Sequence, residues 1–369
     1  MAEQEPNRGM TLLTQYAEAG NLDAQFHLAA ILTESGDHDV AEVWYRKAAE
    51  SGSAPAMTNL ASTLRHRGNE KEADRWLELA VKAGDLYAIT AQGLEFEKRG
   101  QDTTAEELYT KASNLGHGPG MQGLARVLER RGADQDAEQW YRKAAALGES
   151  SAMRWLALRY TRNNDVGAAE RWYLKAARAG DIGAMIYIGR NNLSNAATWL
   201  QKAALAGNIE AMCLLAYRML IQGDTKKAAS WYERAAEAGS GLAMHNLGAL
   251  HSADGNIEEA EGWFVRAFDV GHVGAARNLA NFFTSQGNRS ESIRWLNVGA
   301  EAGDAHCMLQ LGNIELSQRR PARAFEWWQM ALERDESGEV EAIFRRQIPP
   351  LRRNRPIYWA LGLSSDKNK

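Results

Sequence analysis

A glycine returns at an almost fixed interval through most of this 369-residue chain. The interval is 32 residues, except for one interval of 27 residues between Gly180 and Gly207. The ten glycines are Gly20, Gly52, Gly84, Gly116, Gly148, Gly180, Gly207, Gly239, Gly271 and Gly303. A fixed period of this length is typical of a solenoid, in which each unit buries its apolar face against the next. We therefore expect ten units over residues 21–335, the sixth (181–207) shortened, preceded by an N-terminal cap helix within residues 1–20.

Each unit is numbered here from the residue after its glycine, so that the next glycine is position 32. The five residues that the sixth unit lacks are placed after position 10. Position 9 is then Ala or Gly in all ten units, and position 8 is Leu or Ile in nine. Positions 4, 5, 8, 9 and 12 share one face of a helix with 3.6 residues per turn. The first half of each unit is therefore predicted to be an amphipathic helix, helix A.

The second half of each unit predicts another helix, helix B. A turn precedes it, usually with glycine at position 16, and small residues stand at positions 21 and 28. Position 24 is Trp in nine units: Trp44, Trp76, Trp140, Trp172, Trp199, Trp231, Trp263, Trp295 and Trp327. Small residues let helices approach closely, and large aromatic residues fill the space between units. Residues 41–52 and 137–148 consequently agree at nine of twelve positions.

The order of small and aromatic positions resembles the tetratricopeptide repeat, and the "WYRKAAExG" ending followed by "xxxAMxxLA" looks more like the related Sel1-like repeat family. This resemblance implies an all-α, right-handed superhelical α-solenoid, and it implies a scaffold or adaptor that binds a peptide or helix of another protein. Two features depart from the usual pattern. The period is 32 residues, and Gly replaces the terminal Pro of the tetratricopeptide unit.

Charge is distributed unevenly between the array and the end of the chain. The net charge of −4 divides into −10 for residues 1–344 and +6 for residues 345–369. We expect a C-terminal cap helix within 336–350 and a flexible basic tail over 351–369, with Arg352, Arg353, Arg355 and Trp359 as candidate contact residues. The tail supports an alternative function, a regulatory or nucleic-acid-associated protein. It leaves open self-docking, partner binding or no role, and the acidic array argues against nucleic acid elsewhere.

The candidate binding surface follows from the positions of helix A opposite the packed stripe. These are positions 3, 6, 10, 13 and 14, which we call the helix-A face; the family resemblance implies that they line a concave surface. Units four to six carry arginines there, opposed only by Glu129: Arg126, Arg130, Arg154, Arg162 and Arg190. Such a strip suits an acidic peptide or a C-terminal carboxylate. Alternatively, the arginines are solvated or pair with acids on neighbouring loops.

The remaining candidate residues on this face come from units seven to ten, where the set is nearly neutral: Tyr217, His245, Arg277, Asn281 and Asn313. The shortened sixth unit has two interpretations. Either the deletion opens a notch beside the arginine strip or changes the curvature of the superhelix, or it is a tolerated change in a turn.

Catalysis, metals and cofactors find no support in the sequence. Only two cysteines are present, and the eight histidines are scattered without metal-ligand spacing. We find no phosphate-binding loop and no nucleophile motif, so we predict a protein without enzymatic activity, metal or cofactor. The polar N-terminus has no signal-peptide pattern, and no apolar run is long enough to span a membrane. We therefore expect a cytoplasmic protein.

Overall fold

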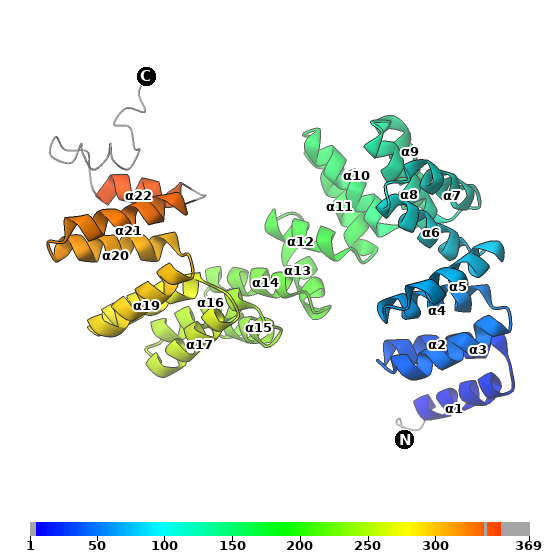
Figure 1. Ribbon diagram of the computed structural model, residues 1–369, viewed down its shortest axis with the longest axis horizontal. Helices are drawn as coiled ribbons and strands as arrows, with labels where there is room; N and C mark the ends of the chain where they lie inside the picture. Colours follow the sequence, from blue (N-terminus) through cyan, green and yellow to red (C-terminus); the bar gives the residue numbers. More distant parts are fainter. Residues whose placement is uncertain (1–4, 336–337, 348–369) are drawn as a thin grey trace. The chain divides into compact units, whose positions relative to one another are not determined.

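The computed structural model describes residues 5–335 and 338–347, and every helix or strand assigned within these ranges is an α-helix (Figure 1). The prediction of an all-α solenoid of two-helix units is confirmed. The chain divides into two compact units, Met1–Ala184 and Met185–Lys369, called here the N-terminal and C-terminal units. The division falls within the helix A of repeat six.

The described helices alternate as helix A and helix B between a first and a last single helix. Up to repeat five they are α1 (Glu5–Glu18), α2 (Leu22–Glu34), α3 (His38–Glu50), α4 (Ala54–His66), α5 (Glu70–Lys82), α6 (Leu86–Lys98), α7 (Asp102–Asn114), α8 (Gly118–Arg130), α9 (Asp134–Ala146), α10 (Ser150–Arg162) and α11 (Val166–Arg178). From repeat six on they are α12 (Ile182–Arg190), α13 (Ala196–Leu205), α14 (Ile209–Ile221), α15 (Thr225–Glu237), α16 (Gly241–Ala253), α17 (Ile257–Asp269), α18 (Gly274–Ser285), α19 (Arg289–Glu301), α20 (Ala305–Ser317), α21 (Pro321–Glu333) and α22 (Glu339–Gln347).

The glycines that close the helices explain the regular helix length. Gly52 has a φ of 96°, a left-handed conformation that costs glycine little because it has no Cβ. The amide of the following Ser53 donates to the carbonyl of Ala48 at 3.0 Å, and that of Gly52 donates to Ala49 at 3.0 Å. These are the bonds of a Schellman motif, which satisfies the last carbonyls of a helix. Each such turn ends one helix and starts the next.

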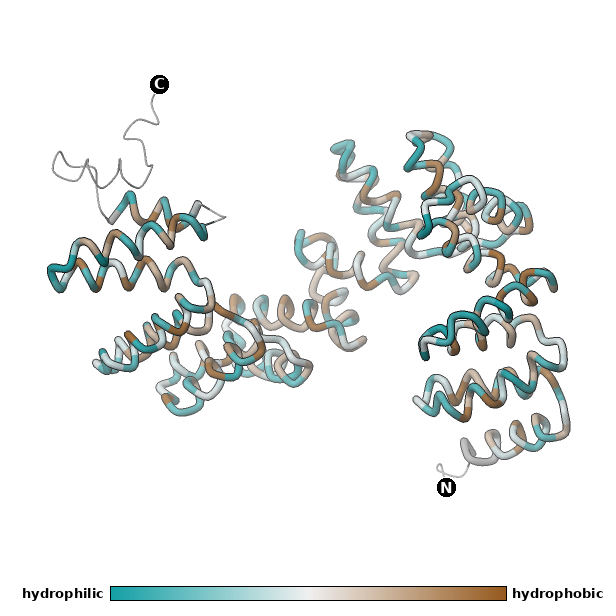
Figure 2. The backbone as a smooth tube through the Cα atoms, in the orientation of Figure 1, coloured by the Kyte–Doolittle hydropathy of each residue, from teal (hydrophilic) through white to brown (hydrophobic). Residues whose placement is uncertain are grey.

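Position 25 of helix B supplies the largest buried side chains of the array. The buried residues there include Tyr45, Leu77, Tyr109, Tyr141, Tyr173, Leu200, Tyr232, Phe264, Leu296 and Trp328. Helix A lies so close to these large side chains that only the smallest residues fit on it at the points of contact. A Cβ on Gly123 would lie 2.4 Å from a ring carbon of Tyr109, so glycine is required at that contact. Figure 2 shows the matching alternation of hydrophobic and hydrophilic residues along the helices.

Most tryptophans at position 24 lie at the edge of this core, whereas Trp199 of repeat six is buried. Trp44, Trp76 and Trp140 are partly buried and pack against the core from its side. A basic residue at position 27, one turn later, covers the ring in six of the repeats; the Nζ of Lys143, for example, lies 3.8 Å from the ring centroid of Trp140. Such cation–π contacts contribute about 0.5–1 kcal/mol each at exposed sites. The recurring "WYRKAA" motif therefore combines a core residue, a flanking ring and its cationic cover.

Candidate functional site

Position 6 of the helix-A face joins neighbouring repeats. In the N-terminal unit and in the C-terminal unit, the side chain at position 6 contacts the residue at position 1 of the following repeat, 27 residues later in the sequence. The pairs are Thr58 with Asp85 (2.9 Å), Thr90 with His117 (3.0 Å), Gln122 with Glu149 (2.8 Å), Arg154 with Asp181 (3.0 Å) and Cys213 with Ser240 (3.6 Å). Side chains of position 6 are thus already engaged within the chain.

A buried carboxylate organises the start of the arginine strip. The side chain of Glu97 is 6% exposed, and it accepts bonds from Nε and Nη2 of Arg126, both at 2.6 Å, and from the hydroxyl of Tyr109 at 2.7 Å. Arg130 donates to Glu97 at 2.9 Å and to Asp102 at 2.8 Å. Burial alone would raise the pKa of Glu97, but the bonds from Arg126 and Tyr109 and the nearby charge of Arg130 outweigh it, so this pKa lies below its usual value.

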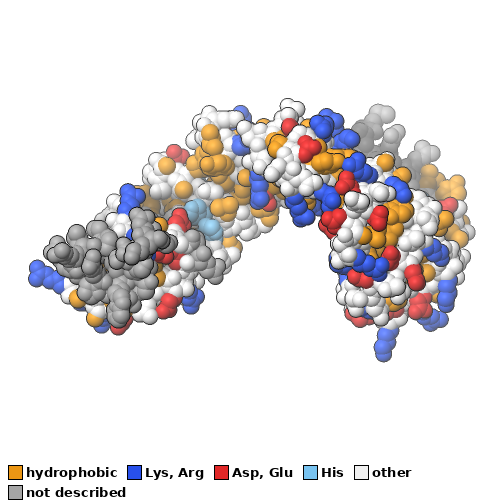
Figure 3. Space-filling view, turned by 90° about the horizontal axis from the view of Figure 1, so that it is seen from above, with side chains coloured by type: hydrophobic (Ala, Val, Ile, Leu, Met, Phe, Trp, Pro, Cys, Tyr) orange, Lys and Arg blue, Asp and Glu red, His pale blue; other side chains and the backbone are white. Residues whose placement is uncertain are grey.

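The other arginines of the strip are mostly paired as well. Arg154 donates to Asp181 at 3.0 Å, and Arg190 lies 2.7 Å from Glu210. Arg162 is exposed and makes no ion pair among the residues that the structure describes. Figure 3 shows Lys and Arg side chains interleaved with Asp and Glu over the N-terminal unit. An acidic ligand would have to displace these intramolecular carboxylates from four of the five arginines.

The candidates in repeats seven to nine differ in their exposure. Tyr217 is 57% exposed on α14. His245 is half-buried; its ring nitrogens lie 3.0 and 3.3 Å from Nδ2 of Asn278. Arg277 is half-buried on α18, close enough to that site to lower the pKa of His245, although less than burial and the neighbouring His272 do. Only Tyr217 of these residues is largely open to solvent.

The last two candidate residues within the described helices, Asn281 and Asn313, form hydrogen bonds with neighbouring side chains. Asn281 is exposed and accepts a long bond of 3.5 Å from Gln310. Asn313 accepts from the indole nitrogen of the buried Trp328 at 3.3 Å. The tail candidates Arg352, Arg353, Arg355 and Trp359 lie outside the described residues.

The shortened sixth repeat loses one turn of helix A. Its α12 has nine residues, whereas α14, the next helix A, has thirteen. The turn that follows α12 holds Asn192 and Asn195 with φ values of 51° and 59°. In repeat four, Arg130 at position 14 donates to Glu97, which stands at position 13 of the preceding repeat. In repeat seven, position 14 is Ile221, which is 69% exposed. The deletion removes the equivalent of that partner position.

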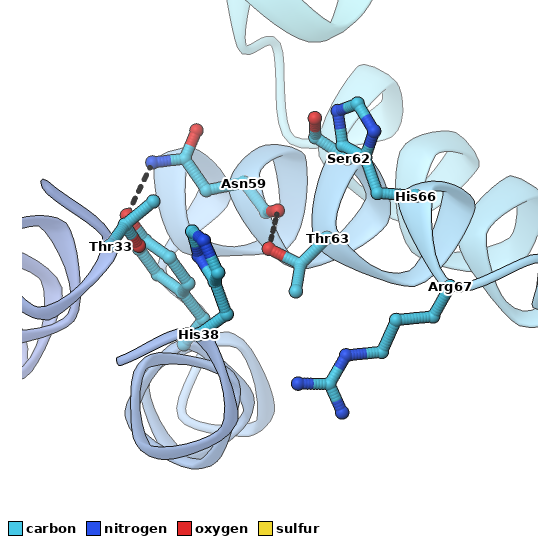
Figure 4. Close-up of a pocket in the computed structure, with 8 residues that line it drawn as sticks. Thr33, His38, Asn59, Ser62, Thr63, His66 and Arg67 are labelled. Carbon is cyan, nitrogen blue, oxygen red and sulfur yellow. Dashed lines mark hydrogen bonds between the residues drawn. The ribbon is translucent and has the colours of Figure 1, made fainter. Parts of the chain in front are cut away.

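A hollow on the helix-A face lies in repeats one to three, where sequence analysis singled out no site. Two adjacent pockets of about 650 and 500 Å³ share Asn59, Ser62 and His66. The first is also lined by Thr33, His38, Tyr45, Thr63 and Arg67, and the second by Thr58, Ala61, Arg65, Leu77, Tyr87, Ala91, Leu94, Glu95 and Lys98. We call these residues together the polar trough. Figure 4 shows the first pocket, with His38 on one side and Ser62, Thr63, His66 and Arg67 following α4.

The floor of the polar trough retains unused hydrogen-bonding capacity. Asn59 donates to the hydroxyl of Tyr45 at 3.2 Å, which leaves its amide oxygen as an acceptor. Ser62 and His66 are exposed, and their side chains make no hydrogen bond within the described ranges. In the second pocket Tyr87 is 66% exposed and Leu94 is 39% exposed. The trough therefore combines polar groups suited to a peptide backbone with apolar surface suited to a side chain.

A signal for this trough exists in the sequence, but it is weak. Positions 7, 10 and 14 of repeat two are Asn59, Ser62 and His66, which are uncharged or weakly basic and shorter than the arginines at positions 10 and 14 of repeat four. Short side chains at three neighbouring positions leave space, yet the depth of the resulting hollow depends on how α2, α4 and α6 are spaced.

Two further searches of the described helices gave negative results. None of these helices is long and apolar enough to cross a bilayer. No group of three or more His, Cys, Asp or Glu side chains in the described part of the chain is arranged to hold a metal ion.

Comparison with known families identifies the repeat type. A model of the Sel1 repeat matches more than half of the chain, at residues 22–53, 92–117, 131–149, 150–181, 183–208, 209–240 and 305–336. A model of the tetratricopeptide repeat matches residues 54–83 and 241–271. No curated protein matches the chain significantly in sequence.

Solved structures with the same kind of fold include two bacterial proteins. One is a protective antigen present in uropathogenic Escherichia coli strains that displays an SLR fold; it is 22% identical, with a TM-score of 0.55, and the match covers 97% of this chain and 84% of that one. The other is a Sel1 repeat protein from Oxalobacter formigenes, 23% identical with a TM-score of 0.47, over 74% of this chain and 91% of that one. The first likeness agrees with the solenoid fold described above.

Proposed function

Since this chain belongs to the Sel1 repeat family, we propose that it is a scaffold that binds a segment of a partner protein in the polar trough. Sel1 and tetratricopeptide repeats typically serve as protein–protein interaction scaffolds. The observation that carries this proposal is the pair of adjacent pockets on the helix-A face of repeats one to three.

The chemistry of the trough favours a peptide with both polar and apolar contacts. Asn59 and Ser62 offer an acceptor and a hydroxyl to backbone groups, which every peptide carries. Tyr87 and Leu94 offer exposed apolar surface for one side chain. Tyr is also among the residues that most often dominate binding energy at protein interfaces.

The charges around the trough argue against a strongly acidic ligand. Arg67 forms ion pairs with Asp39 and Glu42, and Arg65 pairs with Asp74 at 2.6 Å. A carboxylate of the partner would compete with these acids, which are held close by the same chain. We therefore favour a neutral, partly apolar segment over the acidic peptide that the arginine strip suggested.

Blocking the trough tests this proposal. Ser62→Trp places a large ring at the residue shared by both pockets, and because Ser62 is exposed the core is left intact. We expect it to lower the recovery of specific partners at least tenfold in affinity purification from the protein's own cells, quantified by mass spectrometry. The matched control is Ser230→Trp on α15, where an exposed helical serine lies far along the chain. Equal recovery with both variants and the wild type would reject the trough.

A further inference from the structure

The junction between repeats eight and nine has a histidine at position 1, a residue type found there in one other repeat, the fourth (His117). Most repeats place Asn, Ser or Asp there, and its side chain caps the next helix A; Asp304, for example, accepts from the amide of Cys307 at 2.8 Å. Repeat nine has His272 instead. Its helix α18 begins at Gly274 with no side-chain cap bond. The N-terminus of α18 therefore lacks the side-chain cap that most other helices A of the array have.

The His272 ring packs instead against a second histidine. Its centroid lies 4.9 Å from that of His245, the residue at position 6 of repeat eight, with the rings nearly perpendicular. The ring of Phe264 from α17 also packs against His245, with 5.8 Å between the ring centroids, and Nδ2 of Asn278 from α18 lies 3.0 Å from Nε2 of His245. The pair thus occupies the place that Cys213 and Ser240 occupy at the preceding junction.

The surroundings of this pair disfavour a proton on either ring. Burial lowers the pKa of His245, and the neighbouring His272 and Arg277 lower it further. Burial followed by Arg277 lowers the pKa of His272. The titratable groups that act on the two rings are His272, on His245, and Arg277, on both, and no carboxylate of the described residues stands among the causes of either shift. His272 also precedes the N-terminus of α18, where the helix dipole disfavours positive charge.

Protonation would also disturb the contact with Asn278. The amide nitrogen of Asn278 donates to a ring nitrogen of His245, and a protonated imidazole has only donors to offer. The contact then persists only if the amide rotates so that its oxygen faces the ring. Both effects act on the contacts that His245 of α16 makes with His272, in the turn before α18, and with Asn278 of α18.

We propose that the His245–His272 pair is an acid-sensitive joint, at which the contact of α16 with the turn before α18 and with Asn278 loosens reversibly as the pH falls below neutral. The sign follows from linkage: a histidine whose folded pKa lies below its unfolded pKa leaves stability unaffected above the unfolded value of about 6.5. Stability is then lost as the pH falls from there towards the folded pKa. The array thereby acquires one joint that responds to mild acid.

The joint at His117 provides an internal comparison. His117 also stands at position 1, where its Nδ1 lies 3.0 Å from the hydroxyl of Thr90, and burial lowers the pKa of His117. In contrast to the pair in the C-terminal unit, Glu149 and Asp85 act to raise its pKa. These carboxylates offset part of the cost of a proton, so we expect a smaller acid response there.

Hydrogen exchange of the full-length chain tests the joint. After correction for intrinsic rates, residues 241–285 are expected to lose on the order of tenfold protection between pH 7.4 and pH 5.5, because at pH 5.5 a histidine with an unfolded pKa of about 6.5 favours the open form by about that factor when it stays neutral in the folded form. Residues 209–237 are expected to keep theirs. His272→Asn restores the cap residue found in repeats one and seven, and it should remove most of this loss. An even loss across residues 209–333, or an unchanged loss in the variant, would overturn the proposal.

A second measurement decides the case in which the variant is already open at neutral pH. Nuclear magnetic resonance of the wild-type chain reports the titration midpoint of each imidazole separately. His245 and His272 are expected to titrate below 6.5. His251, which lies at the other end of α16 beside Asn256, serves as the reference for a group outside the pair. Midpoints at or above 6.5 for both members of the pair would refute the joint.

Discussion

Replacing Trp328 by alanine is expected to lower the free energy of unfolding of the C-terminal repeats by about 3–5 kcal/mol, the usual cost of deleting a buried tryptophan. Trp328 is only 1% exposed. Its ring packs against Phe344 of α22 with 5.2 Å between centroids, and its indole nitrogen donates to Asn313. Truncation would leave a cavity and remove the hydrogen bond that the indole donates to Asn313. Urea unfolding, followed by circular dichroism and by local hydrogen exchange of α20 and α21, measures the loss.

The neighbouring residue supplies the matched control. Trp327 carries the same side chain one position earlier, but it lies partly buried at the edge of the core. Trp327→Ala is therefore expected to cost about 1–2 kcal/mol, in proportion to the smaller apolar area that it buries. Equal losses for the two variants would mean that position 24, and not position 25 alone, forms the core of the array.

Removing Glu97 is expected to have the second largest effect. Glu97→Ala leaves the buried hydroxyl of Tyr109 without its acceptor and separates Arg126 and Arg130 from their shared carboxylate. Breaking a fully buried pair costs about 3–5 kcal/mol, and because these arginines are 43% exposed and regain water, we expect about 2–3 kcal/mol. Glu129→Ala, at the same position one repeat later, should cost less than about 1 kcal/mol, since Glu129 accepts a single bond from Trp155.

Two further results separate this network from simple loss of a surface charge. A double-mutant cycle of Glu97→Ala with Tyr109→Phe should show a coupling above about 0.5 kcal/mol, because the two side chains share one hydrogen bond. Because the folded pKa of Glu97 is lowered, its stabilisation is complete above the unfolded value and decreases as the pH falls through the folded pKa. Additive losses of stability in the double mutant would contradict the network. So would a Glu97→Ala variant whose stability decreases at low pH as much as that of the wild type.

Much of the fold can be predicted from the sequence because the same helix-packing contacts recur in every repeat. The glycine period gives the repeat length, and the small residue at position 9 locates the face of helix A that meets helix B. The aromatic pair at positions 24 and 25 was harder to interpret. Periodicity marks Trp140 and Tyr141 alike, and only the structure shows that Tyr141 is buried while Trp140 flanks the core under Lys143.

The candidate site was less predictable because it depends on contacts that vary between repeats. Position 6 holds Thr58, Gln122 and Arg154 in different repeats, so no periodic signal marks it as a link to the next repeat. The pairing of Arg126 with Glu97 spans 29 residues and depends on the stagger between two helices A. Exposed arginines could be identified from the sequence, but whether each already held a carboxylate could not.

The central claim is that a partner segment lies in the polar trough of repeats one to three. The most direct test places a photo-crosslinking amino acid at one residue at a time in the full-length chain, at Ser62 in the trough, at Arg162 in the arginine strip, or at Ser230 on helix B of repeat seven. The account predicts strong crosslinks to one partner peptide from residue 62 and weak or absent crosslinks from residues 162 and 230. Crosslinks to the partner from residue 162 with none from residue 62 would contradict it and would place binding on the arginine strip.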